Sequence, residues 1–279
     1  FDYYTDLVSE IKLETAFDGS DKIDPAGPFG VFVNIRHTPE IERESGGFGR
    51  YLQNQNNTMY SYNFGRPTEN YREKFEETVR QAMGEGFEIL SVTFQDDKVH
   101  SRSTSEEGWR RTPYAYLLLK AKRPEVDMLP SLRLDLDFTD TSGYVVLPVE
   151  SPPLPLDASG AMKDPRPFDQ LNVVQTLDER QAAEGKLILE VRATARGLVP
   201  ELGQILEVKS PGFEVSGVDA QPLAVSRFDP ESEANAVVSE RHWLVSMKAQ
   251  GNLEERPESF RFAQAKAQTV SSITQRYED

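Results

Sequence analysis

Regular alternation of apolar and charged residues is the feature that most restricts how this chain can fold. In the segment 132–138, leucines and a phenylalanine occupy every even position and charged residues every odd position. Successive side chains of a β-strand point to opposite faces, so this spacing predicts a strand with one buried face and one solvated face. Apolar residues recur with the same period at 11–17, 29–35, 145–149 and 187–193. The sequence therefore predicts a mainly β fold.

A single stretch has helical periodicity. Apolar residues recur there at every fourth position, which places them along one side of a helix about four turns long. We predict one amphipathic helix over about 68–84, with Thr68 as its N-cap and Gly84 at its end. The apolar residues of its stripe are Tyr71, Phe75, Val79 and Met83.

The segment before this helix is predicted to form a β-hairpin. Residues 48–54 and 58–64 flank the polar pair Asn56-Asn57, which is typical of a turn between two aromatic runs. We interpret the aromatic face of this hairpin as the packing partner of the helix, because an amphipathic helix must bury its apolar side.

Chain length and proline distribution indicate two tandem domains. A chain of 279 residues exceeds the usual size of one domain. Prolines are concentrated between residues 150 and 168, where their density favours an extended spacer. We predict a β-rich domain at 1–150 with the helix packed on its sheet, a proline-rich linker at 151–170, and a domain at 171–279. Short strands with turn residues between them are typical of β-sandwiches, so we predict that the two tandem domains are of the Ig-like β-sandwich type.

Charge and composition narrow the range of partners. The net charge of -15 repels phosphate groups, so we expect no nucleic acid as a main partner. No apolar run approaches the roughly 20 residues that a membrane helix needs, so no membrane insertion is expected within this segment. The first residue is Phe1 instead of Met, which favours a segment of a longer protein. A membrane anchor that flanks this segment is compatible with that expectation.

The sequence lacks the motifs of the common enzyme classes. It has no cysteine, which excludes disulfides, thiolate metal sites and cysteine nucleophiles. No G-x-S-x-G, P-loop or dinucleotide glycine motif occurs, and Gly46-Gly47-Phe48-Gly49 is interpreted as the approach to the hairpin, with no helix after it. We interpret His37, His100 and His242 as surface or strand-edge residues. No cofactor is predicted.

One acidic cluster has the residue types of a calcium site. Asp135, Asp137 and Asp140 offer hard oxygen ligands at short spacing. The glycine is misplaced and the terminal glutamate is missing for an EF-hand loop. Alternation also places Asp135 and Asp137 on the solvated face of their strand, so we favour solvent exposure over Ca²⁺ binding.

Aromatic residues are the candidates for a binding surface. Exposed tyrosine or tryptophan rings on a β-rich surface can stack on sugars or peptides. Trp109 lies in a polar loop and is the best candidate for an exposed contact. The other candidates are Tyr51, Tyr60 and Tyr62.

These observations favour a non-enzymatic, extracytoplasmic structural or protein-interaction module, the soluble part of a larger bacterial surface or periplasmic protein. The tandem β architecture, the proline spacer and the lack of a catalytic motif support this reading. A carbohydrate- or peptide-binding module that uses the aromatic residues is the first alternative, with a protein or polysaccharide partner. A hydrolase that uses carboxylates from different strands is the second, because such pairs leave no sequence spacing to recognise.

Overall fold

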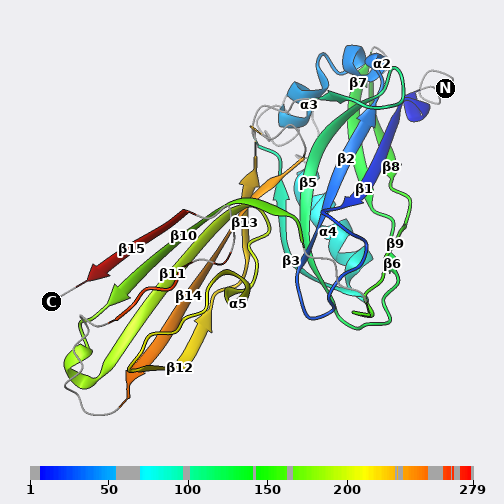
Figure 1. Cartoon of the computed structure of the whole chain (residues 1–279). Coiled ribbons are helices and arrows are strands. Elements are labelled where there is room, and N and C mark those ends of the chain that lie inside the picture. The colour runs from blue at the N-terminus through cyan, green and yellow to red at the C-terminus, as the bar shows by residue number, and fades with distance from the viewer. Residues whose placement is uncertain are drawn as a thin grey trace. The chain divides into compact units, whose positions relative to one another are not determined.

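The computed structural model describes residues 7–54, 70–96, 101–140, 143–161, 166–229, 231, 235–250, 260–264, 266 and 271–277. Among them, 49% lie in strands and 16% in helices, which confirms the predicted mainly β class. Contacts divide the chain into two compact units (Figure 1). Unit 1 comprises Phe1–Pro165 and Pro230–Asn235, and unit 2 comprises Arg166–Asp229 and Ala236–Asp279.

Unit 1 is built on a five-stranded antiparallel sheet. Its strand order is β1-β2-β5-β3, and the short β4 pairs with the other end of β5. Strand β5 is central, and residues 112–119 are all buried because the sheet is covered on both faces there. The strands are β1 (Ile11–Phe17), β2 (Phe29–His37), β3 (Phe87–Phe94), β4 (Arg102–Ser103) and β5 (Arg110–Ala121).

The predicted amphipathic helix is confirmed as α4 (Tyr71–Met83), and all four residues of its stripe are buried. Its N-cap is Asn70 and not the predicted Thr68, since the Asn70 side chain accepts hydrogen bonds from the backbone N–H groups of Arg72 and Glu73. Thr68 itself lies outside the described residues.

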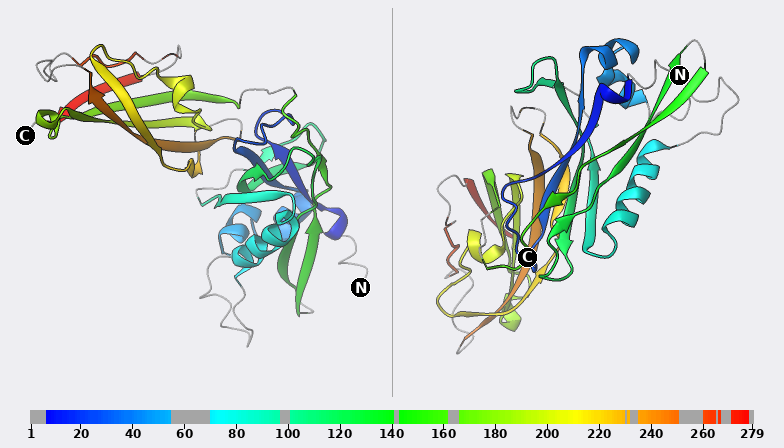
Figure 2. Two further views of the ribbon diagram at one scale, coloured as in Figure 1. Left: turned by 90° about the horizontal axis from the view of Figure 1, so that it is seen from below. Right: turned by 90° about the vertical axis from the view of Figure 1, so that its right-hand side faces the viewer.

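A β-hairpin packs beside this helix. Strands β7 (Arg133–Asp140) and β8 (Gly143–Glu150) pair in antiparallel register, as the sequence indicates. Figure 2 shows them as a long two-stranded ribbon next to α4. The even-numbered leucines of β7 enter the same core as Phe75 and Val79. Together α4 and this hairpin cover one face of the unit 1 sheet.

The hairpin predicted at 48–54 and 58–64 is wrong in its first half. Residues 48–54 form helix α3 (Phe48–Asn54), which follows helix α2 (Pro39–Glu44) after a tight turn. The apolar residues of α3 are Phe48 and Leu52, spaced by one helical turn, and both enter the core. Residues 55–69, with Tyr60, Tyr62 and the predicted second strand, lie outside the described residues.

The start of the predicted proline-rich linker belongs to the folded body of unit 1. Strand β9 (Leu154–Pro155) pairs with β6 (Met128–Leu129), and the backbone N–H of Ile23 donates to the carbonyl of Asp157 at 2.9 Å. Ala158 is buried. Pro155 is compatible with β9 because this short strand pairs with a neighbouring strand on one edge only.

Unit 2 contains one six-stranded sheet with the order β12-β14-β11-β10-β15, and β13 pairs with β14 beyond β12. Its pairings are antiparallel apart from the parallel pair of β10 and β15. The strands are β10 (Phe168–Asp178), β11 (Lys186–Gly197), β12 (Phe213–Ala220), β13 (Ala224–Phe228), β14 (Val237–Ala249) and β15 (Ser271–Tyr277). The turn from β10 to β11 contains the 3-10 helix η2 (Ala182–Glu184).

Two irregular segments cover this sheet. Residues 198–212, with helix α5 (Leu202–Ile205), and residues 260–264 hold buried apolar side chains, among them Ile205 and Phe260. The side-chain amide of Gln175 on β10 donates to the carbonyl of Ala263 at 2.8 Å, which ties the second segment to the sheet. Because the described strands of unit 2 form one sheet, the Ig-like sandwich stays a prediction.

No helix among the described residues combines the length and the apolar character that crossing a membrane requires.

Candidate functional site

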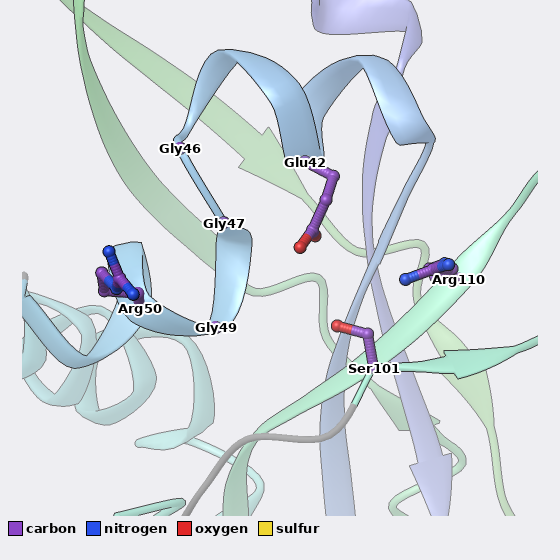
Figure 3. A pocket seen from close by; sticks show the side chains of 7 residues that line it. All are labelled: Glu42, Gly46, Gly47, Gly49, Arg50, Ser101 and Arg110. Carbon is purple, nitrogen blue, oxygen red and sulfur yellow. The ribbon is translucent and has the colours of Figure 1, made fainter.

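A pocket of about 330 Å³ opens on unit 1 beside the turn between α2 and α3 (Figure 3). The turn and the start of α3 form one wall, and residues at the base of the β4–β5 arm form the other. Two arginines stand on opposite sides of the pocket in Figure 3. The lining residues are Glu42, Gly46, Gly47, Gly49, Arg50, Ser101 and Arg110.

Two glycines shape the first wall. Gly46 and Gly47 have φ angles of 67° and 107°, which residues with a side chain rarely adopt. The N–H of Gly47 donates to the carbonyl of Glu42 at 2.9 Å, which closes the end of α2. Ile41 precedes the turn in the chain and Phe48 follows it, and both side chains are fully buried, which anchors the turn to the core. The sequence interpretation of these glycines as the approach to a hairpin is therefore wrong.

The second wall belongs to an arm that charged groups hold against the sheet. Strand β4 pairs with the start of β5, and Trp109 lies in the turn between them. The ammonium of Lys12 lies 4.2 Å from the centre of the Trp109 ring. Arg36 bonds Glu106 at 2.5 Å. These contacts hold the turn of the arm, and Ser101 lies at its base.

Ser101, which lines the pocket, begins a chain of hydrogen bonds that ends on a buried histidine. The Ser101 and Thr112 hydroxyl oxygens are 2.7 Å apart. The Thr112 oxygen lies 3.0 Å from His37 Nε2, whereas the Ser101 oxygen lies 3.4 Å from the same nitrogen. His37 is fully buried, so its interpretation as a surface or strand-edge residue is wrong.

The environment of His37 favours the neutral form of its ring. Burial lowers the pKa of His37, and this effect outweighs the opposing influence of the Thr38 carbonyl and the Glu42 carboxylate. Arg110 acts in the same direction as burial. The ring Nδ1 lies 3.4 Å from the carbonyl oxygen of Thr38, which only accepts hydrogen bonds, so this contact favours the tautomer with its proton on Nδ1.

Glu42 lines the pocket with its carboxylate group (Figure 3). Its Oε2 atom is buried and has no hydrogen-bond partner among the residues that the structure describes. Figure 3 shows the Glu42 carboxylate and the Ser101 hydroxyl directed into the same space. A carboxylate oxygen that is removed from water without a partner is costly, so this arrangement favours a donor supplied from outside the chain.

The predicted aromatic candidates have packing roles where they are described. Tyr51 stacks on Phe138 with ring centres 5.0 Å apart, and its hydroxyl donates to Asp137 at 3.3 Å. Burial raises the pKa of the Tyr51 hydroxyl well above its ordinary value. Trp109 is half-buried under Lys12, so it is not the freely exposed ring that the sequence favoured.

In the predicted acidic cluster, the Asp135 carboxylate is used in ion pairs with basic side chains. Asp135 is buried instead of solvated, and its carboxylate contacts Lys74 and Arg133, both at 2.9 Å. Helix α4 lies over this part of β7 and places Lys74 above the strand face that alternation had assigned to solvent. The side chain of Asp140 lies outside the described residues. Within the described residues, no group of three metal-binding side chains is close enough to hold a metal ion.

The Asp135 ion pairs predict a dependence of stability on pH. Burial alone would raise the pKa of Asp135, but the bonds from Lys74 and Arg133 lower it overall. A lowered folded-state pKa stabilises the fold above the unfolded-state pKa of about 3.9, and that stabilisation is lost as the pH falls below it. We expect Asp135→Asn to cost about 2 kcal/mol at pH 7 and less at pH 3, measured by urea unfolding. An equal cost at both pH values would contradict this account of the pair.

Glu42, Ser101 and the histidine behind Ser101 have no sequence signal that joins them. Ser101 and His37 are 64 positions apart, and Glu42 lies on a short helix that periodicity did not identify. The paired glycines after α2 were the one visible sign of an unusual turn. Comparisons with protein-family models and with curated proteins found no match to this chain.

Proposed function

We propose that this chain is a non-enzymatic protein-interaction module in which unit 1 holds a group of its partner in the pocket at Glu42 and Ser101. The observation that carries the proposal is the buried Glu42 oxygen that has no partner among the described residues. A binding site is expected to keep such an acceptor ready, although it destabilises the free protein. A structural residue is expected to be paired.

The charged groups of the described residues support binding over catalysis. A carboxyl group that acts as a general acid near neutral pH needs a raised pKa. Every described carboxyl group with a resolved shift has a lowered pKa instead. A hydrogen bond from a neighbouring residue is the main cause in three of them, and in Asp135 the bonds and charges of Lys74 and Arg133 together outweigh desolvation. These groups are Asp135, Asp157, Asp169 and Asp178. Their environments give no support to the carboxylate hydrolase.

The proposal includes an extracytoplasmic location, at a bacterial surface or in a periplasm. Its support is the combination of tandem β units and an acidic balance. Fractionation of cells that express the full-length gene product tests this part directly. Recovery of the protein in the cytosolic fraction would contradict it.

The stability of Glu42→Gln tests the binding site without knowledge of the ligand. We expect this variant to unfold with a free energy about 1 kcal/mol higher than the wild type, because it removes a buried charge that has no partner. The favourable effect of an acidic group in the first turn of a helix is smaller, about 0.5 kcal/mol. The measurement is urea unfolding at pH 7.

Glu44→Gln is the matched control, since it removes the same charge from an exposed position near the end of α2. A loss of about 1 kcal/mol in Glu42→Gln alone would identify Glu42 as a structural residue and contradict the proposed site. Catalysis is tested separately with p-nitrophenyl acetate. Turnover that disappears in Ser101→Ala, with an acyl group found on Ser101 by mass spectrometry, would contradict the non-enzymatic part.

A further inference from the structure

The direction of the hydrogen bonds behind Ser101 follows from the tautomer of His37. The Thr38 carbonyl favours the neutral tautomer with its proton on Nδ1, and in that tautomer Nε2 is an acceptor. Thr112 is the nearer hydroxyl to Nε2, at 3.0 Å, and it donates its single hydrogen there. The Thr112 oxygen then accepts the hydrogen of Ser101 across 2.7 Å. The hydrogen of Ser101 is therefore directed inward, away from the pocket.

This assignment makes the Ser101 oxygen an acceptor toward the pocket. A hydroxyl group has one hydrogen and two lone pairs, and the hydrogen is already used. The neighbouring Glu42 carboxylate is also an acceptor, and its Oε2 atom has no partner among the described residues. The inner part of the pocket therefore needs a group with several hydrogen-bond donors and a positive charge.

The outer part of the pocket has the opposite character. Arg50 and Arg110 are exposed at its edges, on opposite sides. Guanidinium groups donate hydrogen bonds and attract carboxylates. Two positive groups would repel a ligand that carries only a cation. A ligand with a carboxylate near its cation avoids that repulsion.

We infer that the pocket binds a primary ammonium group that is accompanied by a carboxylate on the same small ligand, as in a free α-amino acid or the amino-terminal end of a short peptide. This inference rests on the proposed function of the pocket. The ammonium group donates to Glu42 and Ser101, and the carboxylate lies toward Arg50 or Arg110. A volume of about 330 Å³ is at the lower end of the range for ligand pockets, which fits one or two small residues.

Isothermal titration calorimetry of the full chain tests the inference with glycine and glycylglycine as probes. We expect a Kd on the order of 1 mM for the better of the two. N-acetylglycine, which lacks the ammonium group, and glycinamide, which lacks the carboxylate, are each expected to bind at least about tenfold more weakly. Tighter binding of glycylglycine supports the amino-terminal end of a peptide as the ligand, as the proposed function requires. Tighter binding of glycine would identify a free amino acid as the ligand and would contradict a protein partner at this pocket.

Variants locate the binding. Glu42→Gln and Ser101→Ala are each expected to weaken binding about tenfold. Glu44→Gln and Ser103→Ala remove the same groups from exposed neighbouring positions and are expected to bind as the wild type does. At least one of Arg50→Gln and Arg110→Gln is expected to weaken the binding of glycine but not that of glycinamide. Arg123→Gln, at an exposed turn, is their control.

Three results would overturn the inference. Equal binding of N-acetylglycine would show that no ammonium group is recognised, although the pocket still binds a ligand. No binding of any probe, together with the expected stabilisation by Glu42→Gln, would reject this ligand class and leave the proposed function in place. No binding together with destabilisation by Glu42→Gln would reject both.

Discussion

Replacing Phe75 with aspartate is expected to unfold unit 1. The Phe75 side chain is 1% exposed and packs edge-on against Tyr114, with ring centres 5.2 Å apart, and against Phe94. Loss of a buried phenylalanine costs about 3–5 kcal/mol, and an unpaired carboxylate in its place adds several more. Because a domain is stable by only about 5–15 kcal/mol, the two effects together exceed or nearly exhaust its stability.

Heat unfolding, followed by tryptophan fluorescence, measures this effect. Trp109 reports on unit 1, and Trp243 reports on unit 2. Glu77→Asp is the control, because it also introduces aspartate, with its low helix propensity, into α4, but at an exposed position. An unchanged melting temperature in Phe75→Asp would mean that the apolar stripe of α4 is not buried.

Val245→Asp is expected to have the equivalent effect on unit 2. Val245 is fully buried on β14, between Leu189 of β11 and Val218 of β12. Burial of an unpaired carboxylate and loss of the valine contacts are expected to cost several kcal/mol, about half or more of the stability of a typical domain. The exposed neighbour Ser246 provides the control variant Ser246→Asp.

The pair of variants also tests the division of the chain. In Val245→Asp we expect the Trp243 signal to be that of an unfolded unit while the Trp109 signal keeps its melting transition. Phe75→Asp is expected to give the reverse. Loss of both signals in either variant would show that the two units do not fold independently.

The strands and the long helix were predictable because each repeats one simple period. The burial of Leu132, Leu134 and Leu136 agrees with their spacing, and the four-residue spacing from Tyr71 to Met83 agrees with α4. Each of these patterns lies within one short segment, and the apolar side chains on one face of a strand or helix all enter the same core. Register and face then follow from the pattern itself.

The short helices were not predictable by the same method. Helix α3 has seven residues, too few to show more than one repeat of its apolar spacing. Its aromatic residues Phe48 and Tyr51 also favour strands in sequence statistics. Packing decides the conformation here. The ring centres of Phe48 and His37 are 4.4 Å apart, and those of Tyr51 and Phe138 are 5.0 Å apart.

The candidate site was hidden for a related reason. The hydrogen bonds that hold Ser101 join β2, β5 and the residue before β4, which the sheet brings together from distant positions. Asp135 shows the converse case. Alternation placed it correctly opposite the leucine face, but the sequence had no sign that Lys74 of α4 would cover that side.

The most direct measurement of the central claim is a two-dimensional ¹H–¹⁵N NMR titration of the full chain with glycylglycine. We predict that the largest shift changes fall on the backbone amides of Gly46, Gly47 and Ser101, which line the pocket. We also predict that Glu42→Gln removes them and that Glu44→Gln does not. Changes that are spread over other strands, or that persist in Glu42→Gln, would contradict a binding site at this pocket.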